Sequence, residues 1–452
     1  MTAVWLSLSG ALLLVMGLQH ARGYRRRDTH RRGALIDPEG RSWRGWVRRA
    51  ATAPAAVTLG SVPIPALDET KHFKLIGTTG TGKSTAIREL LSCALRRGDR
   101  AVISDPDGGY LARFGQPYRG DVVLNPFQPD SRRWDPFSEL LDPYDADQLA
   151  GALIPSSADP AAQEWRSYAR TFVSALLRCQ ARQRRDLVEF WRLLAVASVE
   201  ELRPMLAGSA AQPFLDADNA RMFGSIRSVA VSAAVALEYV QAQRSAPFSV
   251  RAWIREGRGV LFIPYRASQI AALRSMIAAW LRLAIFETMS QPEGRDQRLW
   301  FVVDELDALG AIDGLKDALA RLRKFGGRCV LGFQSVAQVS STYGQGEAQT
   351  LVENCGNTLI LRCSGSEQGG TSMFASRLIG EREVLRSQTS RGRDRDGTFG
   401  TGSTRRSLQV SEHYSSESAV LASELEQLPD LRGYLKTASS RRWRPVRLDH
   451  RI

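Results

Sequence analysis

The sequence has few of the residues that hold small secreted domains and zinc-binding domains together. Its 452 residues include five cysteines and five histidines. No two cysteines form a Cys-x-x-Cys pair, and the histidines do not cluster. These spacings exclude a disulfide framework and the common zinc sites, and they are typical of a protein kept in a reducing cytosol. A chain of this length has room for two or three domains.

Long apolar runs are also scarce. Residues 1–21 contain no Lys, Arg, Asp or Glu, and their apolar core at 3–18 is 16 residues long. Arginines follow this stretch, whereas a secretory signal peptide carries its positive charge in front. The positive-inside rule then predicts a single-pass anchor in the inner (cytoplasmic) membrane, with the bulk of the chain cytoplasmic. Because the core is shorter than the roughly 20 residues that cross a bilayer, a cleaved signal and a buried helix are the alternatives.

Positive charge is concentrated in three stretches. The net charge is +14, and residues 22–49, 386–407 and 432–452 carry +7, +4 and +6. The remainder of the chain is therefore slightly acidic. A nucleic-acid partner cannot be inferred from the overall charge and has to rest on local patches or on the type of motor.

Two of the basic stretches are predicted to lie outside the globular domains. Residues 22–60 are predicted to form a basic juxtamembrane linker whose residues 22–50 lie on anionic lipid headgroups, with a solvated linker as the alternative. Residues 386–407 are polar and of low complexity, which predicts a mobile basic loop. This loop either stays solvated or contacts nucleic acid or an acidic partner.

The most specific pattern is Gly77-Thr-Thr-Gly-Thr-Gly-Lys-Ser84, which matches the phosphate-binding loop of nucleoside triphosphatases. Its glycines let backbone N–H groups turn toward phosphates, while Lys83 supplies charge to the β- and γ-phosphates and the Ser84 hydroxyl ligates Mg²⁺. A strand-like segment at 72–76 precedes the loop, and a helix-like segment at 85–95 follows it. The residues predicted to bind ATP are Gly77, Thr78, Thr79, Gly80, Thr81, Gly82, Lys83, Ser84 and Thr85.

An acidic pair follows a second apolar segment. Residues 299–303 are Leu-Trp-Phe-Val-Val, and Asp304 and Glu305 come directly after them. Asp304 is predicted to hold Mg²⁺, directly or through water. Glu305 is predicted to polarise the attacking water as general base, which favours hydrolysis over static binding. An isolated match of this kind would be only a buried strand that ends in a charged loop.

Two more polar residues end strand-like segments. Gln334 follows 329–333, and ligands bind beyond the carboxyl ends of the strands in parallel sheets. Gln334 is therefore predicted to sense the γ-phosphate, with a turn-capping amide as the alternative. Asp105 ends the segment 101–104, and its role stays open between the nucleotide edge and a turn.

A basic group lies between the acidic pair and Gln334. Its members are Arg321, Arg323, Lys324 and Arg328. One of them could reach a neighbouring subunit as an arginine finger that stabilises transition-state charge, with a solvated helix end as the alternative.

The pattern of the remaining chain predicts an α/β fold with a mostly parallel sheet. Strand-like segments occur at 73–76, 101–104, 121–124, 259–263, 299–303, 329–333 and 358–362. The strand signal disappears between about 130 and 245, where the sequence is helical. We therefore predict a nucleotide-binding domain in two parts, 61–129 and 246–452, interrupted by an all-α insertion at 130–245.

From about residue 60 onward, the chain resembles the type IV secretion coupling proteins, the TraD/TraG/TrwB family of conjugative DNA-transfer ATPases. The order and spacing of several short motifs carry the resemblance. They are the loop Gly77–Ser84, Arg96-Arg-Gly-Asp-Arg-Ala-Val-Ile-Ser-Asp-Pro-Asp-Gly108, Leu124-Asn-Pro-Phe127, Arg133-Trp-Asp-Pro-Phe137, Glu164-Trp-Arg-Ser-Tyr168, Leu299–Leu306, Arg323–Ser335 and Leu428-Pro-Asp-Leu431.

The resemblance implies a RecA-like P-loop domain, a hexameric ring in the inner membrane and ATP sites between subunits. It implies as partners single-stranded DNA bound without sequence preference, relaxase or relaxosome proteins and the components of a type IV secretion channel. Carried over by motif, Lys83 and Ser84 bind phosphate and Mg²⁺, Asp304 and Glu305 form the acidic pair, and Gln334 is the γ-phosphate sensor. Arg323 falls where the family places its trans-acting arginine.

The chain departs from the family in one respect. Typical members have two membrane helices, and only one apolar segment precedes residue 70 here. Two other functions stay open: a ring ATPase that powers protein secretion or channel assembly without moving DNA, and a nucleotide-regulated membrane adaptor.

Overall fold

The computed structural model describes residues 29–38, 56–157, 159–183, 186–293, 297–366, 369–395 and 404–449. The chain divides into two compact units. The larger unit comprises Asp37–Ala375 and Ala422–Ile452, and the smaller comprises Met1–Ile36 and Ser376–Leu421.

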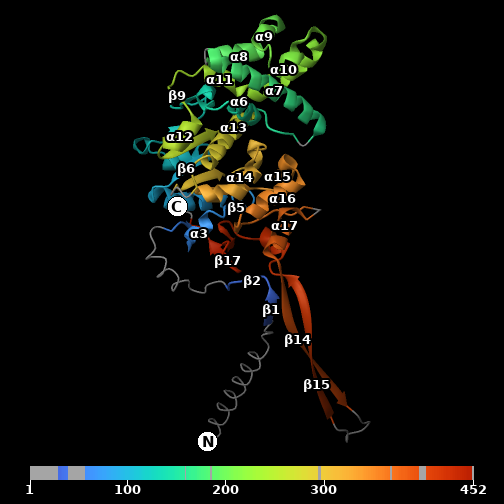
Figure 1. Cartoon of the computed structure of the whole chain (residues 1–452). Coiled ribbons are helices and arrows are strands. Elements are labelled where there is room, and N and C mark those ends of the chain that lie inside the picture. The colour runs from blue at the N-terminus through green and yellow to red at the C-terminus, as the bar shows by residue number, and fades with distance from the viewer. Residues whose placement is uncertain are drawn as a thin grey trace. The chain divides into compact units, whose positions relative to one another are not determined.

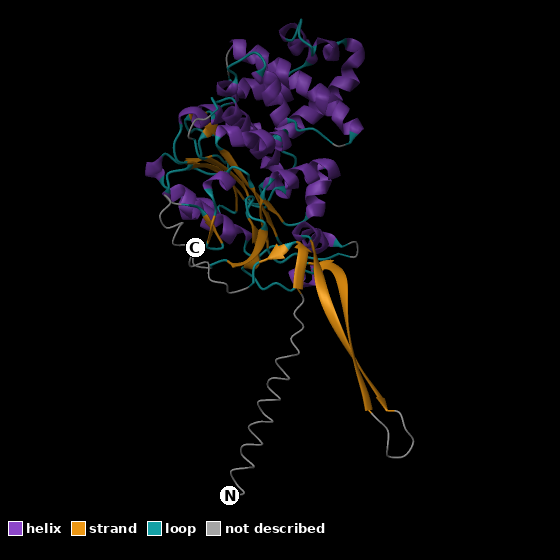
Figure 2. Ribbon diagram, turned by 60° about the horizontal axis from the view of Figure 1, so that its bottom comes forward, coloured by secondary structure: helices purple, strands orange, loops and turns teal. Residues whose placement is uncertain are grey.

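The larger unit is built on a mixed sheet (Figures 1 and 2). Its strands lie in the order β17 (Arg442–Arg447), β16 (Arg432–Lys436), β13 (Asn357–Ile360), β5 (Phe73–Ile76), β12 (Gly327–Phe333), β11 (Leu299–Val303), β6 (Arg100–Pro106), β10 (Val260–Tyr265) and β7 (Val122–Val123). The pairs from β13 through β7 are parallel, and those of β16 with β13 and β17 are antiparallel. The predicted α/β fold with a mostly parallel sheet is confirmed.

The central strands form because they are short, apolar and covered on both faces. Every residue of β5, β10, β11, β12 and β13 is buried, as expected for parallel strands between helical layers. The strands predicted at 73–76 and 299–303 coincide with β5 and β11. The strand predicted at 121–124 is shorter, because only Val122–Val123 pairs with β10.

Helices pack on both faces of this sheet. They are α3 (Ala66–Glu69), α4 (Lys83–Arg96), α5 (Gly109–Phe114), α12 (Val250–Glu256), α13 (Ile270–Met289), α14 (Leu315–Arg321), α15 (Val336–Tyr343), α16 (Gln345–Asn354), α17 (Gly370–Ile379) and α18 (Ala422–Glu426). In α4, Ala86, Leu90 and Ala94 recur every fourth residue and are fully buried. This stripe belongs to the same apolar cluster as Phe73 and Trp300, so it fixes α4 against the sheet.

A helical segment separates β7 from β10 in the sequence. It contains α6 (Asp145–Leu153), α7 (Pro160–Gln183), α8 (Leu187–Ala195), α9 (Val199–Met205), α10 (Ala220–Ala234) and α11 (Ala236–Gln241). Its core includes edge-to-face ring pairs such as Phe172 with Phe223. One short strand, β8 (Arg133–Trp134), lies within the range predicted to lack strands and pairs in parallel with β9 (Pro247–Phe248). A two-residue strand is too short to produce a periodic sequence signal.

The smaller unit contains a long antiparallel ribbon, visible in both views (Figures 1 and 2). Strands β14 (Glu381–Arg395) and β15 (Thr404–Ser418) pair along their whole length, and β1 (Thr29–Gly33) joins only the base of β14. The mobile loop predicted for 386–407 is therefore wrong for the described residues 386–395 and 404–407. A strand ladder uses backbone groups that every residue except proline supplies, and residues 381–418 contain no proline.

The predicted anchor at residues 1–21 lies outside the described residues, as does most of the predicted basic linker at 22–60. Within the described ranges, no helix has both the length and the apolar character needed to cross a bilayer.

Candidate functional site

The loop Gly77–Gly82 connects β5 to α4, as the sequence predicts. Two neighbouring strand ends hold its start, because Gly77 N–H donates to Phe333 O (3.2 Å) and Thr78 N–H donates to Arg362 O (2.9 Å). A Cβ on Gly77 would lie 2.9 Å from Thr81 Oγ1, so a side chain there would push the loop apart. Gly82 (φ 117°) turns the chain into α4 without a side-chain cap. The first N–H groups of α4 therefore stay available for an anion.

Lys83 is buried beneath this loop. Its Nζ donates to Gly77 O (2.6 Å) and Thr78 O (3.1 Å). Burial lowers the pKa of Lys83, and the carboxylates of Asp304 and Glu305 oppose that shift. The ammonium group thus lies inside the loop, where a bound phosphate would replace the weak carbonyl acceptors with a full negative charge.

Asp304 accepts hydrogen bonds from hydroxyl groups of two different helices. Its Oδ2 accepts hydrogen bonds from Ser84 Oγ (2.6 Å) at the start of α4 and from Tyr110 OH (2.7 Å) on α5. Its Oδ1 is buried and has no hydrogen-bond partner among the described residues. A free carboxylate oxygen beside a hydroxyl fits a hard cation such as Mg²⁺, which prefers oxygen ligands. Ser84 and Asp304, predicted as the metal ligands, are therefore in contact.

A second chain of polar contacts runs along the strand ends. Gln334 Nε2 donates to Glu305 Oε1 (3.0 Å), and Thr79 Oγ1 donates to Gln334 Oε1 (3.0 Å). Burial raises the pKa of Glu305, and the nearby carboxylates of Asp304 and Asp307 raise it further. A raised pKa makes Glu305 a stronger base once it is ionised.

Asp105 sits at the end of β6 and holds the start of α5. Its carboxylate accepts from Tyr110 N–H (2.9 Å) and Leu111 N–H (2.7 Å). Burial raises its pKa to about 6. Asp105 therefore contacts the site indirectly, because it positions the backbone of the tyrosine that bonds to Asp304.

Arg323 lies apart from these residues. It is exposed in the short helical turn Leu322–Phe325 that precedes β12, whereas Gln334 follows the other end of that strand. A seven-residue strand separates the two by roughly 23 Å. Arg328, in the same basic group, is buried and pairs with Glu69 (3.0 Å), which assigns it to the core. Within one chain, then, Arg323 does not reach the loop.

A cavity of about 940 Å³ opens beside the loop. Its lining includes Thr78, Thr79, Gln334, Gln338 and Thr371. None of the described residues that line it is charged.

Sequence reasoning missed two contributors. Tyr110 follows Asp105-Pro-Asp-Gly-Gly, and the only signal was a polar residue after glycines at a strand end. Leu431 N–H donates to Thr81 O (2.9 Å), and a Cβ on Gly82 would lie 2.9 Å from the Leu431 side chain. The Leu428–Leu431 motif therefore supports the loop, although nothing in its composition indicated where it packs.

Comparison with protein families places residues 56–449 in the type IV secretion-system coupling protein DNA-binding domain. The chain belongs to this family. The resemblance found in the sequence motifs is thus confirmed.

Characterised coupling proteins share both sequence and fold with this chain. Coupling protein TraD of Escherichia coli (strain K12) is 31% identical over 389 residues, covering 84% of this chain and 52% of TraD. Conjugal transfer protein TraG of Escherichia coli is 23% identical over 370 residues, covering 72% of this chain and 57% of TraG. The chain therefore spans little more than half the length of these two relatives.

Solved structures of the coupling protein TrwB match this chain over nearly their whole length. The plasmid coupling protein TrwB in complex with ADP and Mg²⁺ superposes with a TM-score of 0.80 at 30% identity, covering 94% of this chain and 95% of that one. The unbound TrwBdeltaN70 gives 0.79 at 31% identity, covering 93% and 94%.

Proposed function

We propose that this coupling protein is a membrane-anchored, ATP-driven DNA translocase. It would link a relaxase–DNA complex to a type IV secretion channel during conjugative transfer. The observation that carries the proposal is the convergence of Lys83, Ser84, Asp304, Glu305 and Gln334 at one edge of a sheet that matches nucleotide-bound TrwB.

Each of these site residues has a distinct role in the proposed hydrolysis of ATP. The loop residues 77–85 bind the phosphates through backbone N–H groups, and Lys83 adds a charge. Glu305 takes a proton from the attacking water as general base. Gln334, which bonds Glu305 in this structure, shifts toward the γ-phosphate and reports its presence to the sheet edge.

Ser84 and Asp304 would hold Mg²⁺, which supplies charge neutralisation at the β- and γ-oxygens. Tyr110 keeps the Asp304 carboxylate turned toward Ser84. The buried, unpartnered Asp304 Oδ1 supports this assignment.

The charge missing from the cavity would come from a neighbouring subunit. Arg323 is exposed and lies too far from its own loop, while none of the described residues that line the cavity beside Gln334 is a cation. These facts support a homo-hexamer in which Arg323 of one subunit completes the site of the next.

The chain divides, on this proposal, into an anchor (1–21), a basic linker (22–60), a split nucleotide-binding domain (61–129 and 246–452) and an all-α domain (130–245). DNA would run along the ring as a single strand held by backbone contacts, and such contacts are sensitive to salt and weakly selective for sequence. Residues 1–21 would place the ring in the inner membrane.

ATP turnover tests the proposal. The full chain in detergent is assayed at several protein concentrations with and without single-stranded DNA. Turnover per subunit that rises with both supports shared sites in a DNA motor. Turnover indifferent to DNA would favour the secretion ATPase, and bound nucleotide without turnover would favour the adaptor.

A further inference from the structure

The segment that follows the acidic pair contains a backbone conformation that is almost exclusive to glycine. Gly310 has φ 71° and ψ −168°, a combination that a residue with a Cβ avoids. A Cβ at this position would also lie 3.1 Å from Arg274 Cδ. Such a conformation persists only where the surrounding structure enforces it. The groups that hold Gly310 therefore set the course of the chain between Glu305 and α14.

One buried hydroxyl closes the turn at Gly310. Tyr343 OH donates to Gly310 O (3.3 Å) and accepts from Ile312 N–H (3.2 Å). Tyr343 is 7% exposed and Ile312 is 1% exposed, so their contact is shielded from water. Burial raises the pKa of Tyr343 above its ordinary value, and the phenol therefore keeps the proton that it donates. The hydroxyl thus pairs one backbone acceptor and one backbone donor on the two sides of residue 311.

The helix that ends at Tyr343 starts next to the candidate sensor. Gln334 lies two residues before the first residue of α15, and its Nε2 donates to Glu305 Oε1 (3.0 Å). At the other end of α15, Tyr343 contacts Gly310. A helix of this length is a stiff spacer of about 12 Å. The segment that carries Glu305 is therefore contacted at two points by α15 and the residues that lead into it.

Two other elements hold the ends of this segment. Leu306 N–H donates to Gly332 O (3.2 Å) on β12. At the other end, a Cβ on Gly314 would lie 2.8 Å from the ring of Phe286 on α13, so the two pack closely. Neither contact involves the hydroxyl of Tyr343. The turn that this hydroxyl closes thus lies between two points that are fixed independently.

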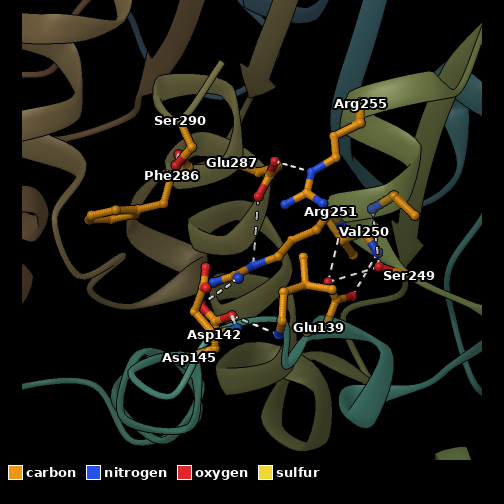
Figure 3. A network of polar contacts seen from close by, with 12 residues as sticks. Glu139, Asp142, Asp145, Ser249, Val250, Arg251, Arg255, Phe286, Glu287 and Ser290 are labelled. Atoms are coloured by element: carbon orange, nitrogen blue, oxygen red, sulfur yellow. Dashed lines mark hydrogen bonds and ion pairs between the residues drawn. The ribbon is translucent and has the colours of Figure 1, made fainter. Parts of the chain in front are cut away.

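α13 is itself fixed where the segment packs on it. Phe286 directly precedes Glu287, which belongs to the network of polar contacts in Figure 3. Arg255 of α12 donates to Glu287 (2.5 Å), and Arg251, also of α12, donates to Asp145 of α6 (2.6 Å). Because Glu287 and Asp145 are buried, these pairs join three helices inside the protein. The glycine end of the segment therefore rests on a well-supported helix.

We propose that Tyr343 is a positioning residue for the general base. By closing the turn at Gly310, its hydroxyl fixes where Glu305 lies relative to Gln334 and the phosphate-binding loop. The inference rests on the role of Glu305 in the proposed function and deepens it by naming the residue that supports the base. Proton abstraction requires the base within hydrogen-bond reach of the water, and small displacements of a catalytic group reduce rates strongly. Loss of the Tyr343 hydroxyl should therefore slow hydrolysis without weakening nucleotide binding.

Tyr343→Phe removes the hydroxyl and keeps the buried ring. The full chain in detergent is assayed for ATP turnover, for ADP affinity and for amide hydrogen exchange in peptides that cover residues 306–314. We expect turnover to fall about tenfold or more, ADP affinity to stay within about threefold, and exchange at 306–314 to rise. Ser174→Ala is the matched control, because it removes a buried hydroxyl that donates to Asp147 in the helical segment. It should change neither turnover nor exchange at 306–314.

Gly310→Ala perturbs the same turn from the other side and serves as the test should Tyr343→Phe not fold. An alanine cannot adopt the conformation of Gly310 without strain, so the turn shifts while the Tyr343 hydroxyl stays. We expect the same reduction in turnover with the same ADP affinity. The double variant should lose little more than either single variant, because both changes disrupt one contact. Multiplied losses, about 100-fold in the double variant, would contradict the shared contact.

The other outcomes separate this inference from the proposed function. Glu305→Gln is the reference, because it removes the base and keeps the shape of the side chain. Wild-type turnover that persists in Glu305→Gln would overturn the general-base role and this inference with it. Inactive Glu305→Gln beside fully active Tyr343→Phe would overturn the positioning role alone. A parallel loss of turnover, ADP affinity and urea unfolding midpoint in Tyr343→Phe would also overturn it, because the tyrosine would then be purely structural.

Discussion

Asp304 is the residue on which the candidate site converges. Hydroxyl groups from α4 and α5 meet at one of its oxygens, and the other oxygen is buried without a described partner. Buried polar atoms are nearly always paired. The unpaired carboxylate oxygen beside the loop therefore supports the proposed Mg²⁺ ligand role of Asp304.

Tyr110→Phe tests whether the Tyr110 hydroxyl orients the Asp304 carboxylate. The variant removes only the hydroxyl that donates to Oδ2, so the carboxylate loses orientation while the buried ring stays. We expect ATP turnover to fall about 10- to 100-fold, with a higher Mg²⁺ requirement. Steady-state turnover over a Mg²⁺ titration measures both. The fully exposed Tyr118, changed to phenylalanine, is the control, and equal activity of the two variants would contradict the role.

Gln334→Ala separates binding from hydrolysis. Gln334 touches Glu305 and Thr79 but not Lys83, so ADP affinity should stay within about threefold, whereas turnover should fall about 100-fold. Fluorescent nucleotide binding and phosphate release measure the two quantities. Gln338→Ala, exposed in the lining of the same cavity, should leave both unchanged. A parallel loss of affinity and turnover in Gln334→Ala would make Gln334 a binding residue.

At the scale of elements, polar side chains at the strand ends hydrogen-bond neighbouring segments. His72 directly precedes β5, lies in the left-handed region (φ 56°) and hydrogen-bonds two neighbouring segments. Its Nδ1 accepts from Cys329 N–H (3.0 Å) on β12, and its Nε2 donates to Leu319 O (2.8 Å). This arrangement requires a neutral imidazole, and burial lowers the pKa of His72 to about 4.

The stability of the chain should therefore depend on pH. A depressed pKa in the folded state means that the contribution is complete above about pH 6.5 and is lost as pH falls toward 4. Between pH 7.5 and pH 5 the loss of unfolding free energy amounts to about 2 kcal/mol. Urea unfolding at pH 7.5 and 5 measures it.

His72→Asn is the informative variant for this prediction. Asparagine tolerates the positive φ and keeps an acceptor near Cys329 N–H, but it does not titrate. The pH dependence over this window should shrink in His72→Asn and persist in the exposed His413→Asn. Identical pH profiles for all three proteins would refute the assignment.

At the scale of the whole molecule, the proposed site draws on more than one chain. Every proposed catalytic group except Arg323 lies at one edge of the sheet, and Arg323 lies before β12 at the other. The proposed function therefore requires that Arg323 act on the nucleotide site of a neighbouring subunit.

Mixed assemblies test that contact. Lys83→Ala and Arg323→Ala should each be inactive alone, whereas a mixture should regain roughly one quarter of wild-type turnover, because some sites combine an intact loop with an intact arginine. Turnover of purified mixtures at several ratios measures the recovery. Lys324→Ala, exposed beside Arg323, should be active alone. Mixtures without recovery would place the role of Arg323 within its own subunit or remove it.

The site residues that lie within short contiguous motifs could be predicted from the sequence. The spacing of Gly77–Ser84 alone specifies a phosphate loop, and apolar segments that end in Asp304 or Gln334 specify strand ends on one edge. Tyr110 could not be foreseen, because its contact with Asp304 depends on the turn that Asp105 holds. The β14–β15 ribbon was missed because its ladder depends on backbone pairing across a distant register rather than on apolar alternation.

The sequence by itself determined the family, the α/β fold and the residues of the loop and acidic pair, because each is encoded in contiguous residues. Tertiary structure decided what depends on segments that are distant in the chain. It joined Ser84 to Asp304 and Gln334 to Glu305, and it buried Arg328 while leaving Arg323 exposed. Distances across a sheet follow from strand order and pairing, and neither is written in any single stretch of sequence.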